Sequence, residues 1–258
     1  EKPKGAAIGA NWTVPDYNIE MIWIAPGTFN MGEESSPHRV TLTKGYWLGK
    51  YEVTQGQWQA VMGNNPSSFK NAGSNAPVEQ VSWEDAVEFC KKLTQKERAA
   101  GRLPAGYEYT LPTEAQWEYA CRAGTTGALH DGTVNIASDT VDASLAQLGR
   151  YAYNGGRPNG TGTPVVSCTT SNATAEVGSY IPNAWGLYDM HGNVFEWCLD
   201  GFVTANPQLP GGTDPVGVTV DTARIRRSGS CLHPAKDNRS ALRSYGAAAF
   251  TNGTGLFA

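Results

Sequence analysis

One stretch of this chain, residues 183–197, restricts its fold and chemistry more than any other. The run Asn-Ala-Trp-Gly-Leu-Tyr-Asp-Met-His-Gly-Asn-Val-Phe-Glu-Trp combines aromatic residues and glycines with the carboxylates of Asp189 and Glu196. Ca²⁺ takes roughly six to eight oxygen ligands and accepts backbone carbonyls beside carboxylates. A loop here can therefore offer one cation both carboxylates and the carbonyls of Gly192 and Val194. The alternative is a turn capped by Asp189, followed by a strand in which Glu196 is solvated.

This stretch closely resembles the signature of the formylglycine-generating-enzyme family, also called sulfatase-modifying factors, which is a branch of the C-type lectin fold. Further segments similar to the family's motifs follow in the expected order, at residues 21–32, 51–58, 77–83 and 111–120. The resemblance covers nearly the whole chain from Met21 onward.

The resemblance implies an α+β, loop-rich C-type lectin fold of the formylglycine-generating-enzyme type. Such a fold has two or three short-to-medium helices and an antiparallel sheet. In the family, the positions that match Asp189, Gly192, Val194 and Glu196 hold a structural Ca²⁺. We therefore expect Ca²⁺ as a structural cofactor of this chain.

Composition excludes several classes of protein. The 258 residues are 40% hydrophobic and 17% charged, so the chain should fold, and it carries fewer charges than an average soluble domain. A net charge of -4 without a basic run argues against nucleic-acid binding. No apolar run approaches the length that spans a membrane. The five cysteines show neither a CxxC pair nor zinc-ligand spacing, which argues against a disulfide framework and leaves one bridge open.

We predict a single folded domain. Residues 1–20 are expected to form a loosely held leader, and residues 21–258 one domain whose variable C-terminal face begins at about residue 231. Met21–Gly32 predicts a hairpin that turns at Pro26–Gly27. Two further strands are expected, at residues 38–42 and 46–53.

Three helices are predicted from capping boxes, in which a Ser or Thr and the residue three positions later exchange hydrogen bonds. The boxes pair Thr54 with Gln57, Ser82 with Asp85 and Thr113 with Gln116. The apolar residues that follow at helical spacing are expected to face the core. Residues 124–179 predict long surface loops with short strands near Ala152 and Val177.

Catalysis is not expected, although the resemblance raises the question. The family's oxidases convert a substrate cysteine to formylglycine with two copper-binding thiols on the C-terminal face. Aligned on residues 228–230 and 239–241, those thiols fall at His233 and Asn238, and neither residue is a cysteine. A soft metal of this kind needs thiolate ligands.

Two other routes to catalysis are also closed. Cys231 lies near the catalytic positions, but Lys236 stands where a partner thiol would be needed. The related iron-dependent sulfoxide synthases need three clustered histidines, and the histidines here show no His-x₃-His spacing. His191 is expected to form a cap or a hydrogen bond in the signature loop. We predict a non-enzyme, with a formylglycine-generating oxidoreductase as the alternative.

The tail from Cys231 to Ala258 resembles that of the variable proteins of diversity-generating retroelements, which include a formylglycine-enzyme-like member from Treponema. These systems mutate adenines, mostly in Asn codons that end in a pyrimidine. Their products therefore exclude Lys, Glu, Gln, Met and Trp, and in this tail only Lys236 belongs to the excluded set. The resemblance implies a rigid scaffold that changes its ligand by side chain alone, without ordering a loop on binding.

Alternation along an extended segment divides the tail into two sets, because successive side chains point to opposite sides. Arg243 and Tyr245 are predicted to pin the tail to the core, together with Arg239, Ser240 and Ala241. The residues predicted to contact ligand are Cys231, His233, Leu242, Ser244, Gly246, Phe250, Asn252 and Gly253.

We expect this face to bind a protein or another macromolecule. We expect no nucleic acid as a partner, no direct membrane span, and a monomer. The resemblance implies a cell-surface or secreted location, with a lipid anchor on the full-length form. A third interpretation is a structural domain of a cell-surface assembly with an invariant partner. A reverse-transcriptase gene beside a near-copy of the tail's coding sequence that differs at adenines would favour the variable protein over this third interpretation.

Overall fold

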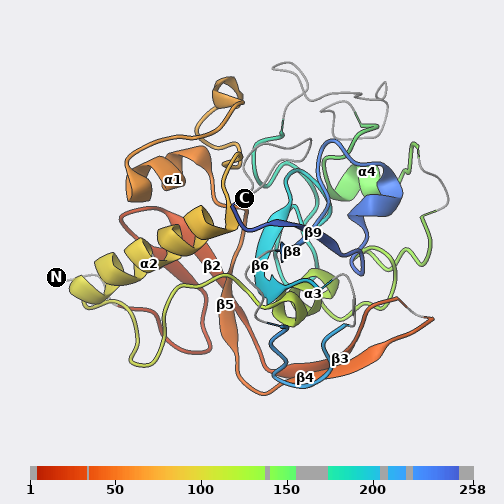
Figure 1. Cartoon of the computed structure of the whole chain (residues 1–258), viewed down its shortest axis with the longest axis horizontal. Helices are drawn as coiled ribbons and strands as arrows, with labels where there is room; N and C mark the ends of the chain where they lie inside the picture. The colour runs from red at the N-terminus through yellow and green to blue at the C-terminus, as the bar shows by residue number, and fades with distance from the viewer. Residues whose placement is uncertain are drawn as a thin grey trace.

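Small sheets and the helices between them form a loop-rich α+β fold (Figure 1). The computed structural model describes residues 5–33, 35–136, 140–154, 174–203, 209–218 and 223–249. The fold class predicted from the sequence is confirmed.

Three sheets of three strands each are present in the described part of the chain, in the orders β1-β2-β5, β3-β4-β7 and β6-β8-β9. All strand pairs are antiparallel except β4 with β7. The strands are β1 (Trp12–Val14), β2 (Ile19–Ile24), β3 (Gly27–Met31), β4 (His38–Leu42), β5 (Tyr46–Gly49), β6 (Glu196–Gly201), β7 (Gly212–Thr213), β8 (Ala223–Arg227) and β9 (Ser244–Ala247).

The N-terminal strands differ from the prediction in two ways. The predicted hairpin over residues 21–32 does not form, because β2 pairs with β1 and β5 while β3 pairs with β4 in another sheet. The expected loose leader also contains β1, and Val14 at its end has no exposed surface. Burial of this apolar side chain integrates residues 12–14 into the fold.

Helices begin where the capping boxes predicted them. Thr54, Ser82 and Thr113 each accept a hydrogen bond from the backbone three residues later, and the side chain there bonds back. The helices are α1 (Gln55–Met62), α2 (Trp83–Ala99), α3 (Glu114–Arg122) and α4 (Leu145–Leu148), with 3₁₀ turns η1 (Lys70–Ala72) and η2 (Ala235–Asn238). The strands predicted near Ala152 and Val177 are absent from the described residues there.

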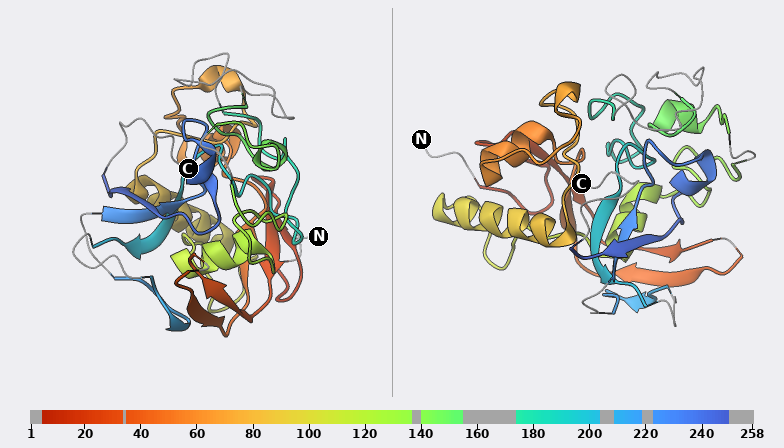
Figure 2. Two further views of the ribbon diagram at one scale, coloured as in Figure 1. Left: turned by 90° about the vertical axis from the view of Figure 1, so that its right-hand side faces the viewer. Right: turned by 45° about the horizontal axis from the view of Figure 1, so that its top comes forward.

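Two main hydrophobic clusters hold the elements together. At one end α1 packs on α2 (Figure 2). There the rings of Trp58 and Phe89 stack with centroids 5.2 Å apart. In the centre α3 buries Trp117 against Ile225 of β8. At the other end η2 lies beside α4 (Figures 1 and 2). The tail thus passes from the far end of the molecule back to the central sheet.

A buried ion network fixes α3 to β8 and to the tail. Arg227, with no exposed surface, contacts Glu114 at 3.2 Å and forms an ion pair with Glu118. Arg122 donates to Glu118 at 2.8 Å, and Arg243 donates to both carboxylate oxygens of Glu114, at 2.7 and 2.8 Å. Each buried carboxylate therefore has two cationic partners.

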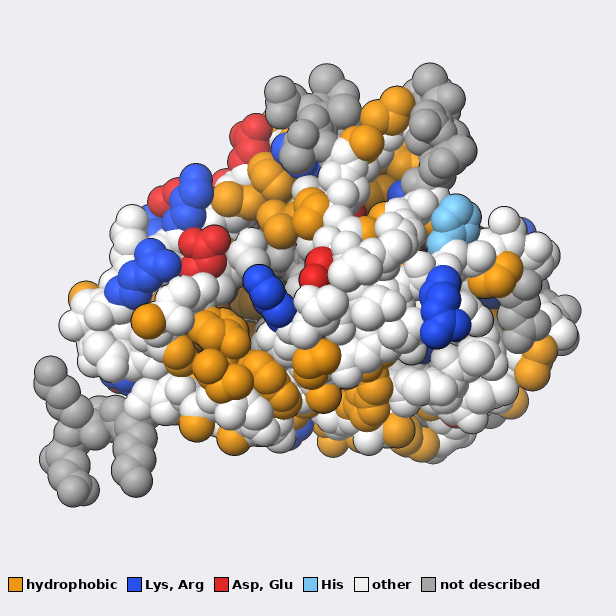
Figure 3. Space-filling model, turned by 90° about the horizontal axis from the view of Figure 1, so that it is seen from below, with side chains coloured by type: hydrophobic (Ala, Val, Ile, Leu, Met, Phe, Trp, Pro, Cys, Tyr) orange, Lys and Arg blue, Asp and Glu red, His pale blue; other side chains and the backbone are white. Residues whose placement is uncertain are grey.

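Three further features are the state of the cysteines, the character of the helices and the side chains on the surface. Cys90, Cys121 and Cys198 are free thiols, whereas Cys231 is disulfide-bonded. Among the described residues no helix has the length and apolar character needed to cross a membrane. The face seen in Figure 3 carries a band of hydrophobic side chains with scattered basic ones.

Replacing Arg227 should destabilise the protein strongly. Arg227→Ala leaves two carboxylates buried without one of their partners, which typically costs about 3–5 kcal/mol. The matched control is Arg98→Ala, whose pair with Glu108 spans 3.9 Å between side chains more than half exposed. That change should stay within about 0.5 kcal/mol by urea denaturation. Equal losses in both variants would contradict a structural role for the network.

Candidate functional site

The residues predicted to bind a cation lie together in one buried loop that leads into β6. Asp189 and Asn193 adopt positive φ angles of 58° and 64° there. Gly192 has φ 111°, and a Cβ at this position would lie 2.2 Å from the carbonyl oxygen of Arg150. Only glycine fits such a conformation and such a close approach.

The cation loop, residues 189–196, is bound to the beginning of the tail. The Ser228 hydroxyl accepts from the N–H of Gly192 and lies 2.9 Å from its carbonyl oxygen. The N–H of Cys231 donates to the carbonyl of Asn193 at 2.9 Å. The position of the tail therefore depends on the conformation of this loop.

A third carboxylate, which sequence analysis did not identify, bonds to the same loop. Glu52 is 5% exposed, and its two oxygens accept from Asn193 Nδ2 at 2.7 Å and from the N–H of Val194 at 3.0 Å. It follows β5 and is far from the loop in sequence. The only local signal is an acidic residue between Tyr51 and Val53, in a segment that resembles a family motif.

Burial changes the acidity of all three carboxyl groups. It raises the pKa of Asp189 to about 7. It also raises the pKa of Glu196 to about 7, and the charge of Asp189 adds to that shift. The pKa of Glu52 is raised by burial and by the charges of Asp189 and Glu196. Near pH 7 Asp189 and Glu196 are therefore partly protonated unless positive charge is supplied.

The loop offers some of the oxygen donors that the predicted Ca²⁺ site needs. Asp189 Oδ2 accepts from the N–H of Gly178 at 2.7 Å, but the buried Oδ1 has no partner among the described residues. Glu196 Oε2 accepts from the indole of Trp117 at 3.0 Å. No cluster of three or more His, Cys, Asp or Glu arranged for a metal occurs in the described residues. The set that fits is the predicted one, namely two carboxylates with the carbonyls of Gly192 and Val194.

His191 has the hydrogen-bonding role expected of it. Its Nδ1 lies 2.8 Å from the carbonyl of Asn238, and its Nε2 accepts from the N–H of His130 at 3.0 Å. The two imidazoles stack with centroids 4.8 Å apart. Burial lowers the pKa of His130 to about 4 and that of His191 well below its usual range. Both rings are neutral at pH 7 and act as packing groups.

The tail places several predicted ligand contacts differently from the prediction. Cys231 has no exposed surface and packs on Val194, so its predicted display is wrong. In β9, Ser244 accepts from Arg226 at 2.9 Å, and a Cβ at Gly246 would lie 3.0 Å from the Trp197 ring. These two positions therefore face the neighbouring strands and are half-buried.

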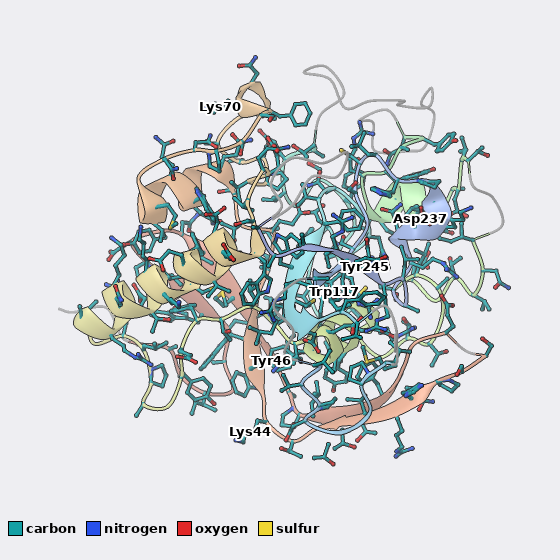
Figure 4. The ribbon with its side chains drawn as sticks, in the orientation of Figure 1. Lys44, Tyr46, Lys70, Trp117, Asp237 and Tyr245 are labelled. Atoms are coloured by element: carbon teal, nitrogen blue, oxygen red, sulfur yellow. The ribbon has the colours of Figure 1, made fainter. Side chains whose placement is uncertain are left out.

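Tyr245, predicted to pin the tail, is exposed instead. It is 47% exposed, projects from β9 (Figure 4), and stacks on Phe202 with centroids 4.1 Å apart. Ala247, two residues on, is also exposed. The alternation along β9 is as predicted, but the two faces are exchanged. Arg243 does pin the tail, through Glu114.

The other predicted contacts lie beside this strand or outside the described residues. His233 and Leu242 are half-buried; His233 Nδ1 lies 2.7 Å from the hydroxyl of Ser230. Of the predicted anchors, Ser240 is fully buried and bonds Ala128, and Ala241 is 9% exposed. Arg239 is paired with Glu33 at 3.1 Å. Phe250, Asn252 and Gly253 lie outside the described part of the chain.

A polar-floored cavity of about 330 Å³ borders the Tyr245–Phe202 pair. Phe202, Val216, Val218 and Arg243 line it, and the buried carboxylates of Glu114 and Asp200 form part of its wall. Val216 and Val218 are 61% and 53% exposed. Apolar side chains thus surround a polar floor on the tail side of the molecule. In this floor Glu114 is paired with Arg243, and Asp200 accepts backbone N–H groups.

Comparison with known proteins places the chain in a family. The model of the sulfatase-modifying factor enzyme 1-like domain matches residues 12–255. The chain belongs to this family. Among curated relatives, the chaperone protein LppX of Paenibacillus barcinonensis is 33% identical over 79% of this chain and 77% of its own length. The formylglycine-generating enzyme of Thermomonospora curvata is 32% identical over 75% of this chain and 56% of the enzyme.

Solved structures show the same fold. Treponema denticola variable protein 1 has a TM-score of 0.72 and 30% identity, with 93% of this chain and 94% of that protein covered. PvdO from Pseudomonas aeruginosa, at 23% identity and a TM-score of 0.69, covers 95% of each chain and shares the fold. The chain spans only about half the length of the Thermomonospora enzyme, 56% of it.

The positions of the family's thiol pair hold residues with other roles. His233 packs edge-on against Phe195, with ring centroids 4.7 Å apart. Asn238 is fully buried and donates to the carbonyl of Pro234 at 2.7 Å. The free thiols of the described residues lie elsewhere, in α2, α3 and β6. This face therefore offers no copper-binding pair of thiolates within the described chain.

Removing a bound cation should lower the melting temperature. A ligand held only by the native state stabilises it by mass action, by about 2.7 kcal/mol at 100 times its Kd. We expect EDTA to lower Tm, Ca²⁺ to restore it, and Asp189→Ala to abolish the difference. The exposed Glu88→Gln is the matched control and should respond like the wild type. If Asp189→Ala leaves Tm and metal content unchanged, the cation loop is misassigned.

The affinity for Ca²⁺ should also depend on pH. Without the cation, Asp189 and Glu196 retain protons up to about pH 7, and Ca²⁺ must displace them. The apparent Kd measured by calorimetry should therefore weaken as the pH falls below 7, with proton release on binding. A Kd that is constant between pH 8 and pH 5 would show that these carboxylates are not the ligands.

Proposed function

We propose that this protein is a non-catalytic, ligand-binding member of its family that displays a diversified surface from its C-terminal segment. The proposal rests on one observation: some residues of the tail anchor it to the core, and others point outward. Arg243 and Ser240 are held by buried partners, while Tyr245 and Ala247 project outward from the same segment. A rigid backbone with free outward side chains can change its ligand without changing its fold.

The chemistry of this face suits a protein or another macromolecule. Tyrosine is among the residues that contribute most at protein interfaces, because it buries a large ring at low entropic cost. Here the Tyr245 ring is preset by its stack on Phe202, and Val216 and Val218 extend the apolar surface beside it. Low net charge and scattered basic residues support a partner other than nucleic acid.

The relatives support binding as the function. The similar Treponema denticola protein is named as a variable protein, and a second relative is named as a chaperone, a class that binds other proteins. By analogy we propose a monomer located at the cell surface or secreted, with a lipid anchor on the full-length form. Ca²⁺ has a structural role in this proposal, since the cation loop bonds to Ser228 and Cys231 at the beginning of the tail.

A formylglycine-generating oxidoreductase is the second candidate, because curated relatives carry that name. Against it stand His233 and Asn238 at the thiol positions. Incubated with copper and a cysteine-containing sulfatase peptide, the protein should form no aldehyde by mass spectrometry. Turnover above that of a Cys231→Ala control would overturn the non-enzyme proposal.

A pair of libraries tests the displayed surface. The first randomises the exposed Tyr245 and Ala247; the second randomises the pinned Ser240, Arg243 and Ser244. We expect members of the first library to keep the wild-type stability within about 0.5 kcal/mol per exposed site, because such positions pin nothing. Most members of the second should fail to fold.

Binding and diversification are measured separately from folding. Selection of the first library on an immobilised test protein such as lysozyme should yield binders, and the second should yield none. Sequencing of the gene in a natural population should show changes at adenines in tail codons. Equal folding yields from the two libraries would contradict the division between anchors and displayed residues. An invariant tail in the population would favour a structural domain with a fixed partner.

A further inference from the structure

Glu52 differs from the other buried glutamates of the described chain in what it holds. Both of its oxygens are used by the cation loop, one by the side chain of Asn193 and the other by the backbone of Val194. The preceding segment also contacts the loop, because the N–H of Tyr188 donates to the carbonyl of Lys50 at 3.0 Å. Residues 50–52 therefore form one wall against which the loop is folded.

The residues that Glu52 contacts are those that set the loop's shape. Asn193 has a positive φ, and its side chain also accepts from the N–H of Ala175 at 2.9 Å. The backbone of Val194 carries a carbonyl that is part of the donor set. A change in Glu52 therefore moves the Val194 carbonyl and the adjoining Gly192 without touching either cation-binding carboxylate.

Charge gives Glu52 a second effect. Glu52, Asp189 and Glu196 form no ion pair with any basic side chain of the described residues. The buried carboxylates of Glu52 and Asp189, with the half-buried Glu196 beside them, are costly to ionise without a cationic partner. A divalent ion offsets more of this charge than a monovalent one, and an additional acidic group strengthens that preference. The unpartnered Oδ1 of Asp189 marks where the positive charge belongs.

We propose that Glu52 is the positioning residue of the cation site: it holds the Asn193–Val194 backbone in the binding conformation and supplies the third negative charge that favours a divalent cation. It acts through the loop and not as a ligand. Groups of this kind behind metal ligands typically contribute roughly 10- to 100-fold to metal affinity. The inference rests on the proposed Ca²⁺ site and identifies what prepares that site for its ion.

The experiment compares two buried glutamates of the full chain. Glu52→Gln keeps the shape but removes the charge and one acceptor. Glu79→Gln is the matched control, since Glu79 is also fully buried and accepts a backbone N–H, from Phe69, away from the loop. Tb³⁺ luminescence sensitised by the nearby Trp117, with competition by Ca²⁺, reports the affinity directly; Trp117 bonds to Glu196. Urea denaturation reports the stability of each variant.

We expect Glu52→Gln to weaken Ca²⁺ binding roughly 10- to 100-fold and to reduce the preference for Ca²⁺ over Na⁺. Glu79→Gln should lose stability and keep the wild-type Kd. Should Glu52→Gln fail to fold, Glu52→Asp serves in its place. It keeps the charge but shortens the reach to Val194, and we expect it to weaken binding as well.

The outcomes separate the two proposals. A wild-type protein without Ca²⁺-competed luminescence would overturn the cation site and this inference with it. Tight wild-type binding that is unchanged in the Glu52 variants would leave the cation site standing and overturn the role of Glu52. Equal weakening by Glu79→Gln would show that only general loss of stability is at work, and would also overturn it.

Discussion

The charge on Arg227 is the constraint on which the centre of this fold depends. A guanidinium with no exposed surface must be paired, and Glu114 and Glu118 of α3 provide the pairs. Because Arg227 ends β8, this contact sets the distance between the helix and the central sheet. Glu114 also binds Arg243, so the same carboxylate that fixes the sheet fixes the tail. The tail strand β9 is therefore held by the core and not only by its ladder.

The cation loop completes this arrangement from the other side of β8. Ser228, directly after the buried Arg227, bonds the loop at Gly192. Glu52 reaches the same loop from the segment that follows β5. Two charge-dependent contacts thus flank the point where the tail begins. In the first, Arg227 is paired with the carboxylates of α3. In the second, the carboxylates at the loop form no ion pair with a basic side chain of the described residues.

The C-terminal face is held by contacts that lie beneath it, through Arg243 with Glu114 and through Ser240 with Ala128. Here the positions of the thiol pair hold His233 and Asn238, which pack and hydrogen-bond locally. The exposed Tyr245 and the cavity beside it give that face a surface suited to binding.

Sequence by itself determined the features that depend on near neighbours or on a specific motif. The three capping boxes were predictable because each joins residues three positions apart, and the proximity of Asp189 to Glu196 because both lie within one signature. Alternation in β9 was also predictable, since it follows from extended backbone geometry.

Only the tertiary structure decided which partners these elements meet. β2 and β3 were expected to pair with each other but joined different sheets, because strand pairing is a choice among distant segments. Which face of β9 is inward depends on Arg226 and Trp197 of neighbouring strands, and local alternation carries no information about them. Glu52 joined the cation loop from far away in sequence for the same reason. Burial and charge pairing are properties of the assembled chain, and they placed Cys231 inside and Tyr245 outside.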